Sequence, residues 1–407
     1  MSEIVNLKSI FDISQHRVGW LNRITRPKTN LTEAFMRADR RRVLGLGLGS
    51  IAGLGLGALG LPKISMAADS IKVGVLLDLS GPLQVFGHTK YQCLQLAAEE
   101  INENGGVLGR KIELVTYDTQ SSNQLYGQFA QQLALKDRVA VVQGCITGAA
   151  REVVRPALSR AKTLFMMNMI NEGVEGACDR NMITTGPTPH QLLEQLIPYM
   201  IKTYGKKMYV LGADYIFGQI SAKWAARIAE KHGGEVVGTE MFPLDVDKFG
   251  PTINRIQAAK PDFVFNIFVG PAHAAFYGQW AAAGLNKQIA MASHTIGDPG
   301  DHLRMPTDVS EGIVTCKNYF DELDTPENIA FLERFKKKFD NYSYVGSLAM
   351  ADYQGLYLWA EMVKKAGSIK RQDVIEAFES GVAIDGPSGR VASDPKTHYC
   401  IMDMYCG

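Results

Sequence analysis

The sequence lacks the motifs that mark common hydrolases and structural metal sites. It contains no Gly-x-Ser-x-Gly elbow, no His-Glu-x-x-His pair and no Cys-x-x-Cys spacing. These patterns position a serine nucleophile, a catalytic zinc and a structural zinc, respectively. We therefore expect no enzyme activity, no metal and no cofactor. The alternative is a catalytic group whose members are scattered in the sequence and meet only in the folded chain.

Cysteine is also scarce. Six cysteines in 407 residues are too few for a scaffold built on disulfides. Their spacing pairs none of them, so the expectation is buried thiols, with a single bridge as the other possibility. The cysteines are Cys93, Cys145, Cys178, Cys316, Cys400 and Cys406.

An excess of positive charge is absent from most of the chain. The whole sequence has 43 Lys and Arg against 42 Asp and Glu, but residues 1–67 hold ten of the former and only four of the latter. The remainder is therefore mildly acidic. It offers no basic surface of the kind that binds nucleic acids or anionic lipids, so we expect no nucleic-acid partner.

Long apolar runs are missing with one exception, DRRRVLGLGLGSIAGLGLGALG at 39–60. It does not fit a dinucleotide-phosphate loop, because a β-strand must precede the glycines of such a loop and three arginines precede them here. The uncharged stretch 43–61 is about long enough to cross a bilayer. It consists mostly of glycine, alanine and leucine, however, and its apolar surface is small for a permanent membrane anchor.

The residues after this run indicate export. Ser65-Met66-Ala67 places small residues at the −3 and −1 positions of a signal-peptidase site. A basic segment, an uncharged helix and such a site together form a signal peptide. Arg40-Arg41 resembles the twin-arginine type, whose partner is the export machinery for folded proteins. We expect residues 1–67 to be a removed N-terminal extension and signal, and the mature protein to be periplasmic. We hypothesise that translation starts at Met36 rather than Met1.

From Ile71 onward, short apolar runs alternate with longer segments of helical period. This alternation is typical of α/β proteins whose parallel sheets carry helices on both faces. About nine strands before residue 320 are too many for one compact sheet, so we predict two Rossmann-like lobes. The predicted strands are 71–77, 111–117, 139–144, 163–167, 207–213, 235–242, 262–268, 289–293 and 312–316.

The chain is predicted to cross three times between these lobes. The first crossing is ITTGPTPHQ (183–191), where prolines and a glycine separate periodic segments. The second is Cys316-Lys317, and the third is the turn cluster 385–389. Three crossings form a hinge that lets two lobes close around a ligand. The predicted first lobe comprises 69–186 and 317–385, and the second comprises 187–316 and 386–407.

Several stretches of the chain resemble a known family. They resemble the type I periplasmic solute-binding proteins of ABC transporters, in the leucine/isoleucine/valine-binding branch. The resemblance implies two α/β lobes, a small-molecule solute held between them, and delivery to a permease and ATPase complex. The stretches are IKVGVLLDLSGPLQVFG (71–87), INENGGVLGRKIELVTYDTQ (101–120), GADYIFGQ (212–219) and KPDFVFNIF (260–268).

Within this family, QGCITGAAREVVRP (143–156) and LGADYIFGQ (211–219) look most similar to the urea and short-chain-amide receptors. Those receptors have a Gly-Cys pair and an Asp-Tyr dipeptide in the same places. This chain departs from them at 167–173, where MNMINEG replaces Tyr-Pro-Thr-Pro-Tyr-Glu-Gly and only the final Glu-Gly is shared. The difference puts the identity of the ligand in doubt.

Ligands of doubly wound sheets lie beyond the carboxyl ends of the strands, so the loops there supply the candidate ligand-binding residues. Thr147 either offers its hydroxyl to a ligand or caps the helix that follows. Phe86 either forms an aromatic wall, as the resemblance implies, or packs under its own loop. Met167 and Met169 either shape an apolar pocket or belong to the core. His294 is expected to be a solvated loop residue, and a ligand contact is its alternative. The candidates are Phe86, Ile146, Thr147, Gly148, Met167, Met169, Tyr215, Phe217, Val269 and Thr295.

Two departures from the family bear on the solute. To hold an α-amino acid, the family uses a hydroxyl where this chain has Ile146 and an acidic partner where it has Thr295. A buried ammonium without a counter-charge is costly, unless Glu172 or Asp214 supplies that charge. We therefore expect urea, a short amide or a related small solute. The alternatives are a branched-chain amino acid, and a role as a ligand sensor instead of a transport component.

Overall fold

The computed structural model describes residues 70–173, 178–298, 300–341 and 344–407. The twin-arginine pair Arg40-Arg41, the apolar stretch 43–61 and the cleavage site at 65–67 lie outside the described residues. Among the helices that are described, none combines the length and the apolar character that crossing a membrane requires.

The first lobe is built on a five-stranded parallel sheet of strand order β2-β1-β3-β4-β5. Its strands are β1 (Ile71–Leu77), β2 (Ile112–Asp118), β3 (Val141–Gly144), β4 (Leu164–Met167) and β5 (Met182–Thr184). Its helices are α1 (Gln84–Glu103), α2 (Asn123–Gln132) with the π-helical turn η3 (Leu133–Asp137), α3 (Gly148–Arg160), α9 (Pro326–Lys338), α10 (Ser347–Ala366) and α11 (Arg371–Glu379).

The second lobe repeats this design, with the strand order β7-β6-β8-β9-β10. Its strands are β6 (Lys207–Ala213), β7 (Glu235–Phe242), β8 (Phe263–Ile267), β9 (Ala290–Ser293) and β10 (Ile313–Val314). Its helices are α4 (Pro189–Tyr204), α5 (Ile216–Lys231), α6 (Gly250–Ala259), α7 (Pro271–Ala282) and α8 (Thr307–Ser310), with the 3-10 turns η4 (Leu285–Lys287) and η5 (Asp301–Arg304). The prediction of two α/β lobes with parallel sheets is confirmed.

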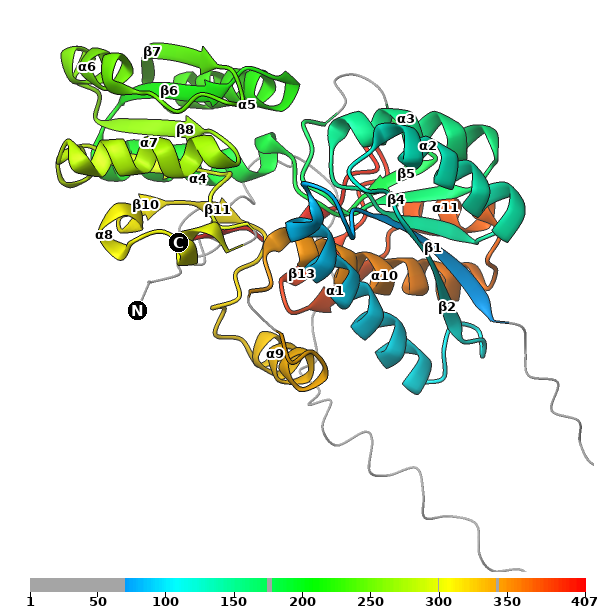
Figure 1. Cartoon of the computed structure of the whole chain (residues 1–407). Coiled ribbons are helices and arrows are strands. Elements are labelled where there is room, and N and C mark those ends of the chain that lie inside the picture. Colours follow the sequence, from blue (N-terminus) through cyan, green and yellow to red (C-terminus); the bar gives the residue numbers. More distant parts are fainter. Residues whose placement is uncertain (1–69, 174–177, 299, 342–343) are drawn as a thin grey trace, which may run out of the picture. The chain divides into compact units, whose positions relative to one another are not determined.

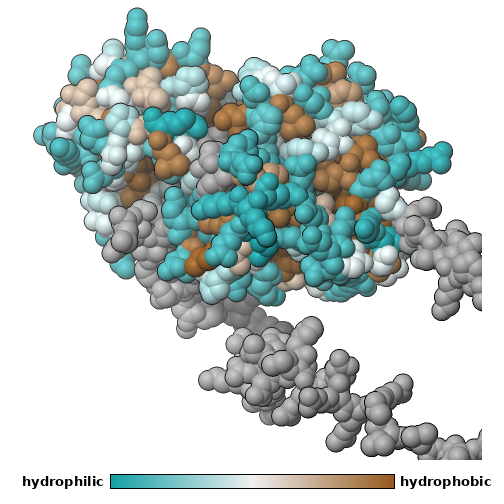
Figure 2. Space-filling model, turned by 60° about the horizontal axis from the view of Figure 1, so that its bottom comes forward, coloured by the Kyte–Doolittle hydropathy of each residue, from teal (hydrophilic) through white to brown (hydrophobic). Residues whose placement is uncertain are grey.

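Helices cover both faces of each sheet, because successive side chains of a strand point to opposite faces. In β1, Val73 and Val75 pack with α1 and α10, whereas Leu76 packs with α2 and α3. In β8, Phe263 packs with α4 and α5, whereas Val264 packs with α6 and α7. Figure 1 shows α2 and α3 together beside β4 and β5. On the face drawn in Figure 2, apolar residues lie in separate small groups among hydrophilic ones.

Two strand predictions differ from the structure. The three-residue strand β5 was not predicted, and the first crossing was placed over it, because three residues are too few to show a period. The single strand predicted at 312–316 is divided into β10 and a separate strand β11 (Cys316–Lys317). β11 leaves the sheet and pairs antiparallel with β15 (Tyr405–Cys406).

The turn cluster at 385–389 is a hairpin within a small antiparallel sheet. This sheet contains β12 (Ala383–Gly386), β13 (Gly389–Ala392) and β14 (Ile401–Met402). Val391, Cys400 and Met402 pack in the core of the first lobe, whereas Cys406 packs in that of the second. The lobe limits remain a prediction, but these contacts favour a third crossing after Met402.

In each lobe, a glycine lets the helix that follows the first strand approach the end of that strand. A Cβ atom on Gly87 in α1 would lie 1.9 Å from the carbonyl oxygen of Asp78. A Cβ atom on Gly218 in α5 would lie 2.0 Å from that of Ala213. Neither distance is tolerated by real Cβ atoms, so a larger residue would push the helix away from the carboxyl edge of the sheet.

We predict that Gly218→Ala destabilises the protein by about 1–3 kcal/mol, because α5 must shift to relieve the overlap. Gly278→Ala in α7 is the matched control, since a Cβ atom there meets nothing within 4 Å. That control should be neutral or stabilising by up to about 1 kcal/mol. Urea unfolding of both variants measures the difference. Equal midpoints would contradict the close approach of α5.

Candidate ligand-binding site

At the carboxyl edge of the first sheet, the chain turns sharply from β3 into α3. Cys145 adopts a positive φ of 74°, which is uncommon for a residue other than glycine. Thr147 then caps α3, and its hydroxyl accepts a hydrogen bond from the Ala150 N–H at 3.1 Å. The capping alternative for Thr147 is therefore observed, while a contact with ligand stays a prediction.

The carboxylate of Glu172 lies against the first turn of α3. A Cβ atom on Gly148 would be 2.9 Å from its Oε1. Arg151 Nη2 forms an ion pair with the same oxygen at 2.6 Å, and both side chains are only 5 % exposed. Arg151 also donates from Nη1 to the Asn171 side-chain oxygen at 3.3 Å. The positive charge at this helix start is therefore balanced by Glu172 from within the chain.

The other first-lobe candidates divide by exposure. Ile146 is 3 % exposed and Met167 is fully buried, and both pack in the core of the first lobe. Phe86 and Met169 are partly exposed and pack against that core. Among the apolar candidates of the first lobe, only Phe86 and Met169 present surface.

The second lobe brings three aromatic side chains together. Tyr215 is the N-cap residue of α5 and is partly exposed, and Phe217 follows in the first turn with 8 % exposure. Their ring centroids are 6.1 Å apart. Phe217 stacks on His294 with centroids 5.5 Å apart. A cluster of three rings therefore lies at the carboxyl edge of the second sheet, and Tyr215 is its most exposed member.

His294 is fully buried, so the expectation of a solvated loop residue is wrong. It stacks on Phe217 and on Phe265, and its Nε2 lies 3.2 Å from the hydroxyl of Ser221. Its Nδ1 has no hydrogen-bond partner among the described residues. Burial, followed by the charges of Lys317 and His273, lowers the pKa of His294 to about 3. The ring is therefore neutral at physiological pH.

Thr295 and Val269 occupy neighbouring loops of the same lobe. The Thr295 hydroxyl lies 3.0 Å from His273 Nε2 and 3.0 Å from the Ser293 hydroxyl. Val269 is partly exposed and lies two residues before the start of α7. Thr295 thus already has protein partners, which leaves it at most a shared hydrogen bond for a ligand.

A buried polar group ties the loop after β9 to the second crossing. Lys317 in β11 donates to the His294 carbonyl oxygen at 3.1 Å and to the Asp298 carboxylate at 2.9 Å. The same carboxylate oxygen accepts from the hydroxyl of Ser347 at 2.7 Å, in the first turn of α10. Asp298 therefore joins the second lobe, the crossing strand and a helix of the first lobe.

Tyr215 and Glu172 link the two sets of candidates. Burial and then the negative charge of Glu172 raise the pKa of the Tyr215 hydroxyl. This effect requires the carboxylate at the start of α3 to lie near the first turn of α5. The chain order alone gives no such proximity, because the two residues belong to loops of different sheets.

Arg151 is absent from the sequence-based candidates, although the sequence carries a signal for it. An arginine in the first turn of a helix opposes the helix dipole unless an anion lies nearby. Its presence four residues after the cap Thr147 therefore indicates an acidic partner. The identity of that partner, Glu172, depends on the fold.

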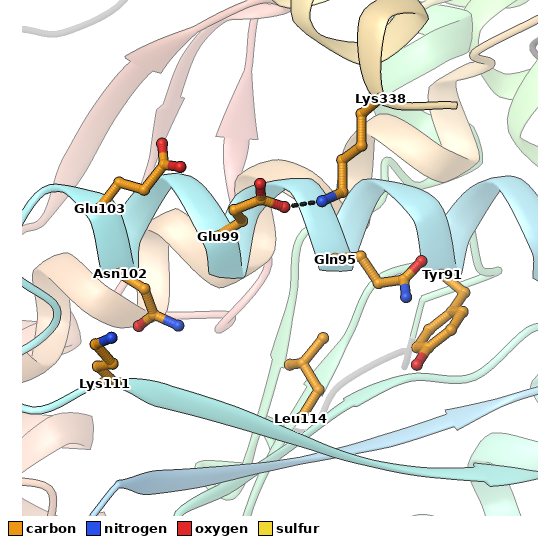
Figure 3. A pocket seen from close by; sticks show the side chains of 8 residues that line it. All are labelled: Tyr91, Gln95, Glu99, Asn102, Glu103, Lys111, Leu114 and Lys338. Atoms are coloured by element: carbon orange, nitrogen blue, oxygen red, sulfur yellow. Dashed lines mark ion pairs between the residues drawn. The ribbon is translucent and has the colours of Figure 1, made fainter. Parts of the chain in front are cut away.

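A groove of about 510 Å³ lies elsewhere on the first lobe (Figure 3). It runs along α1 and the start of β2. Lys338 and Glu99, which form an ion pair, are part of its lining. None of the candidate residues lines this groove. In the parts of the chain that the structure describes, no group of three or more potential metal ligands is found. The groove is lined by Tyr91, Gln95, Glu99, Asn102, Glu103, Lys111, Leu114 and Lys338.

Two sheets of the same order, with polar and aromatic loops at their carboxyl ends, define a two-lobed binding protein. The chain belongs to the periplasmic binding protein family, whose pattern matches residues 70–407. The resemblance seen in the sequence is therefore confirmed. The solved structures to which it is similar are solute-binding proteins of ABC transporters.

Three relatives illustrate this similarity. The Leu/Ile/Val-binding protein homolog 6 of Brucella melitensis biotype 1 is 25 % identical over 87 % of this chain and 91 % of its own length. The leucine-, isoleucine-, valine-, threonine- and alanine-binding protein of Pseudomonas aeruginosa is 24 % identical over 83 % and 89 %. A solute-binding protein of an ABC transporter from Rhodopseudomonas palustris BisB5, solved with 3,4-dihydroxybenzoic acid, is 26 % identical with a TM-score of 0.70. That match covers 83 % of this chain and 92 % of the other.

We predict that His294 makes folding stability depend on pH. Its pKa is about 3 in the folded protein, against 6.5 ordinarily. Between these values only the unfolded chain binds the proton. The stabilisation is complete above pH 6.5 and is lost as the pH falls toward 3.

Urea unfolding between pH 6.5 and 5 measures this effect. Below about pH 6, the slope of the unfolding free energy should be smaller in His294→Gln than in the unsubstituted protein, by about 1.4 kcal/mol per pH unit. His88→Gln is the control, because His88 is exposed on α1. An unchanged slope in His294→Gln would show that the ring titrates normally.

Proposed function

We propose that the chain is the extracytoplasmic solute-binding component of an ABC importer, with a small uncharged polar solute of the urea or short-amide class as its ligand. The solute would be held between the two lobes and delivered to a permease and ATPase complex. Family membership supports the transport role. The observation that carries the choice of solute is the ion pair of Glu172 with Arg151 at the start of α3.

This ion pair disfavours a solute that brings its own carboxylate. A carboxylate would need the free N–H groups of α3 and a cation. The cation, Arg151, is already engaged by Glu172, whose carboxylate also lies against the first turn of α3. Displacing Glu172 would leave a buried charge without its partner, which is strongly unfavourable.

An amide fits the same arrangement without displacing either charge. Its carbonyl oxygen can accept from an N–H group at the start of α3, and its NH₂ group can donate to the Glu172 carboxylate. From the second lobe, Tyr215 and Phe217 would cover the apolar part of the solute. This assigns the ligand contacts to Thr147, Gly148 and Glu172 on one side and to the two aromatic residues on the other.

A carboxylate-bearing solute is the second candidate. The similar protein from R. palustris was solved with an aromatic acid, and two relatives are named for amino acids. The aromatic set of Tyr215, Phe217 and His294 favours a flat or branched apolar group. In that case Arg151 would bind the carboxylate, and Glu172 would turn to the ammonium of an amino acid.

The location follows from the same proposal. The proposed leader at 1–67, with Arg40-Arg41, would direct the folded protein to the twin-arginine machinery and hence to the periplasm. A ligand sensor of the amide-receptor type is the alternative to transport. Uptake of the solute by intact cells, with and without the gene, separates these two roles.

A thermal-shift panel of matched acids and amides separates the two solute classes. The pairs are acetate with acetamide, propionate with propionamide, benzoate with benzamide, and leucine with leucinamide, together with urea. We expect an amide or urea to raise the melting temperature and the matching acid to leave it unchanged. At about one hundred times its dissociation constant, a ligand adds roughly 2.7 kcal/mol of stability, which the shift reports.

Glu172→Gln extends this panel. It leaves Arg151 without its buried counter-charge, so the variant should be less stable and should regain stability with the acid member of a pair. Glu152→Gln is the control, because Glu152 also pairs with Arg151, at 2.8 Å, but is 49 % exposed. Stabilisation of the unsubstituted protein by acids alone would overturn the amide proposal and support the second candidate.

Phe217→Ala tests the placement of the site. We expect at least a tenfold loss of affinity for the solute found in the panel, about 1.4 kcal/mol, because the apolar cover is removed. Leu135→Ala is the control, since Leu135 is 65 % exposed on η3. Isothermal titration of folded protein gives both affinities. Unchanged binding in Phe217→Ala would place the site elsewhere.

A further inference from the structure

We propose that Cys316 and Cys406 form a disulfide bond in the oxidised protein, joining the strand of the second crossing to β15. The inference rests on the pairing of two strands and not on the identity of the solute. An oxidising compartment outside the cytoplasm, as proposed above, is where such a bond persists.

The strand register places the two cysteines directly opposite each other. β11 and β15 are antiparallel, with Cys316 facing Cys406 and Lys317 facing Tyr405. Thr315 and Gly407 exchange both of their backbone hydrogen bonds, at 2.9 and 3.0 Å. Cys316 and Cys406 therefore form the next, non-hydrogen-bonded pair, in which Cα atoms are about 4.5 Å apart. This separation lies within the range that disulfides span.

The two thiols belong to the same buried cluster. Burial, followed by a hydrogen bond with the Cys406 thiol, raises the pKa of the Cys316 thiol. Cys316 is fully buried and Cys406 is 4 % exposed, and both pack in the core of the second lobe. β11 and β15 lie side by side, and Figure 1 shows the C-terminal end of the chain next to β11.

The other four cysteines lie on separate elements. Cys93 is on α1, Cys145 follows β3, Cys178 precedes β5 and is exposed, and Cys400 precedes β14. No hydrogen bond between two of these thiols is observed. The pairing that the sequence left open is therefore decided by the strand register.

The reaction is a thiol–disulfide exchange with a disulfide oxidant such as oxidised glutathione. One thiolate attacks a sulfur of the oxidant, forming a mixed disulfide and releasing one glutathione thiolate. The second thiolate then attacks the protein sulfur of the mixed disulfide and releases the other. The two cysteines lose two protons and two electrons, and the oxidant becomes two thiols. Because both thiols are buried, β11 and β15 must separate briefly for the exchange.

The bond would restrain the hinge. β11 follows the second lobe in the chain, and Tyr405, beside Cys406, packs in the core of the first lobe. A covalent link here fixes the distance between two strands that lie at the crossings. It also closes a long loop, which reduces the conformational entropy of the unfolded chain.

The experiment uses purified full-length protein, treated with either oxidised or reduced glutathione. Both samples are then denatured in N-ethylmaleimide without further reductant and digested with trypsin. We expect fragments 305–317 and 397–407 to be linked after oxidised glutathione and separate after reduced glutathione. Labelled, unlinked fragments in both samples would overturn the proposal.

Fragment 397–407 also contains Cys400, so variants assign the bond. The link should persist in Cys400→Ser and disappear in Cys406→Ser and in Cys316→Ser. A link that survives in Cys406→Ser would overturn the assignment. The oxidised sample should melt several degrees above the reduced one, and this difference should vanish when both Cys316 and Cys406 are replaced. Solute binding is not measured, so failure here leaves the proposed function separately testable.

Discussion

The carboxylate of Glu172 meets two sources of positive charge at the start of α3, the guanidinium of Arg151 and the helix terminus itself. Because the two charged side chains are buried, neither can lose its partner without a large cost in free energy. A solute must therefore fit a charge distribution that is already complete. In the proposed site, this constraint would select among solutes more strongly than the shape of the loops.

The two lobes place their loops by the same rules. Each sheet has its first strand second from one edge, and the helix after that strand is held close by a glycine that faces a carbonyl oxygen. The chemistry of the two loop sets differs nevertheless. The first lobe offers charged and hydrogen-bonding groups, and the second offers aromatic rings. A small solute with one polar and one apolar side would find a different partner on each lobe.

Much of this architecture could be predicted from the sequence. β1 and β6 have the predicted bounds, because each is a seven-residue run that is apolar except for one lysine. β5 escaped detection because three residues show no period, and β11 seemed to continue β10 because a change of partner leaves no local mark. His294 was misjudged, since burial of a loop histidine depends on rings 29 and 77 residues away in the chain, Phe265 and Phe217. That Arg151 needs an acidic partner could have been inferred from its position in the first turn of a helix. Which residue is that partner could not.

Asp298 gives the loop after β9 a mechanical role. Its carboxylate is shared by Lys317 on the crossing strand and Ser347 on a first-lobe helix. Lys317 also holds the backbone of His294, whose ring supports Phe217. Any displacement of the aromatic surface therefore strains the bonds at the crossing. In the proposed hinged protein, a solute resting on those rings would therefore also change how easily the lobes move about the crossing.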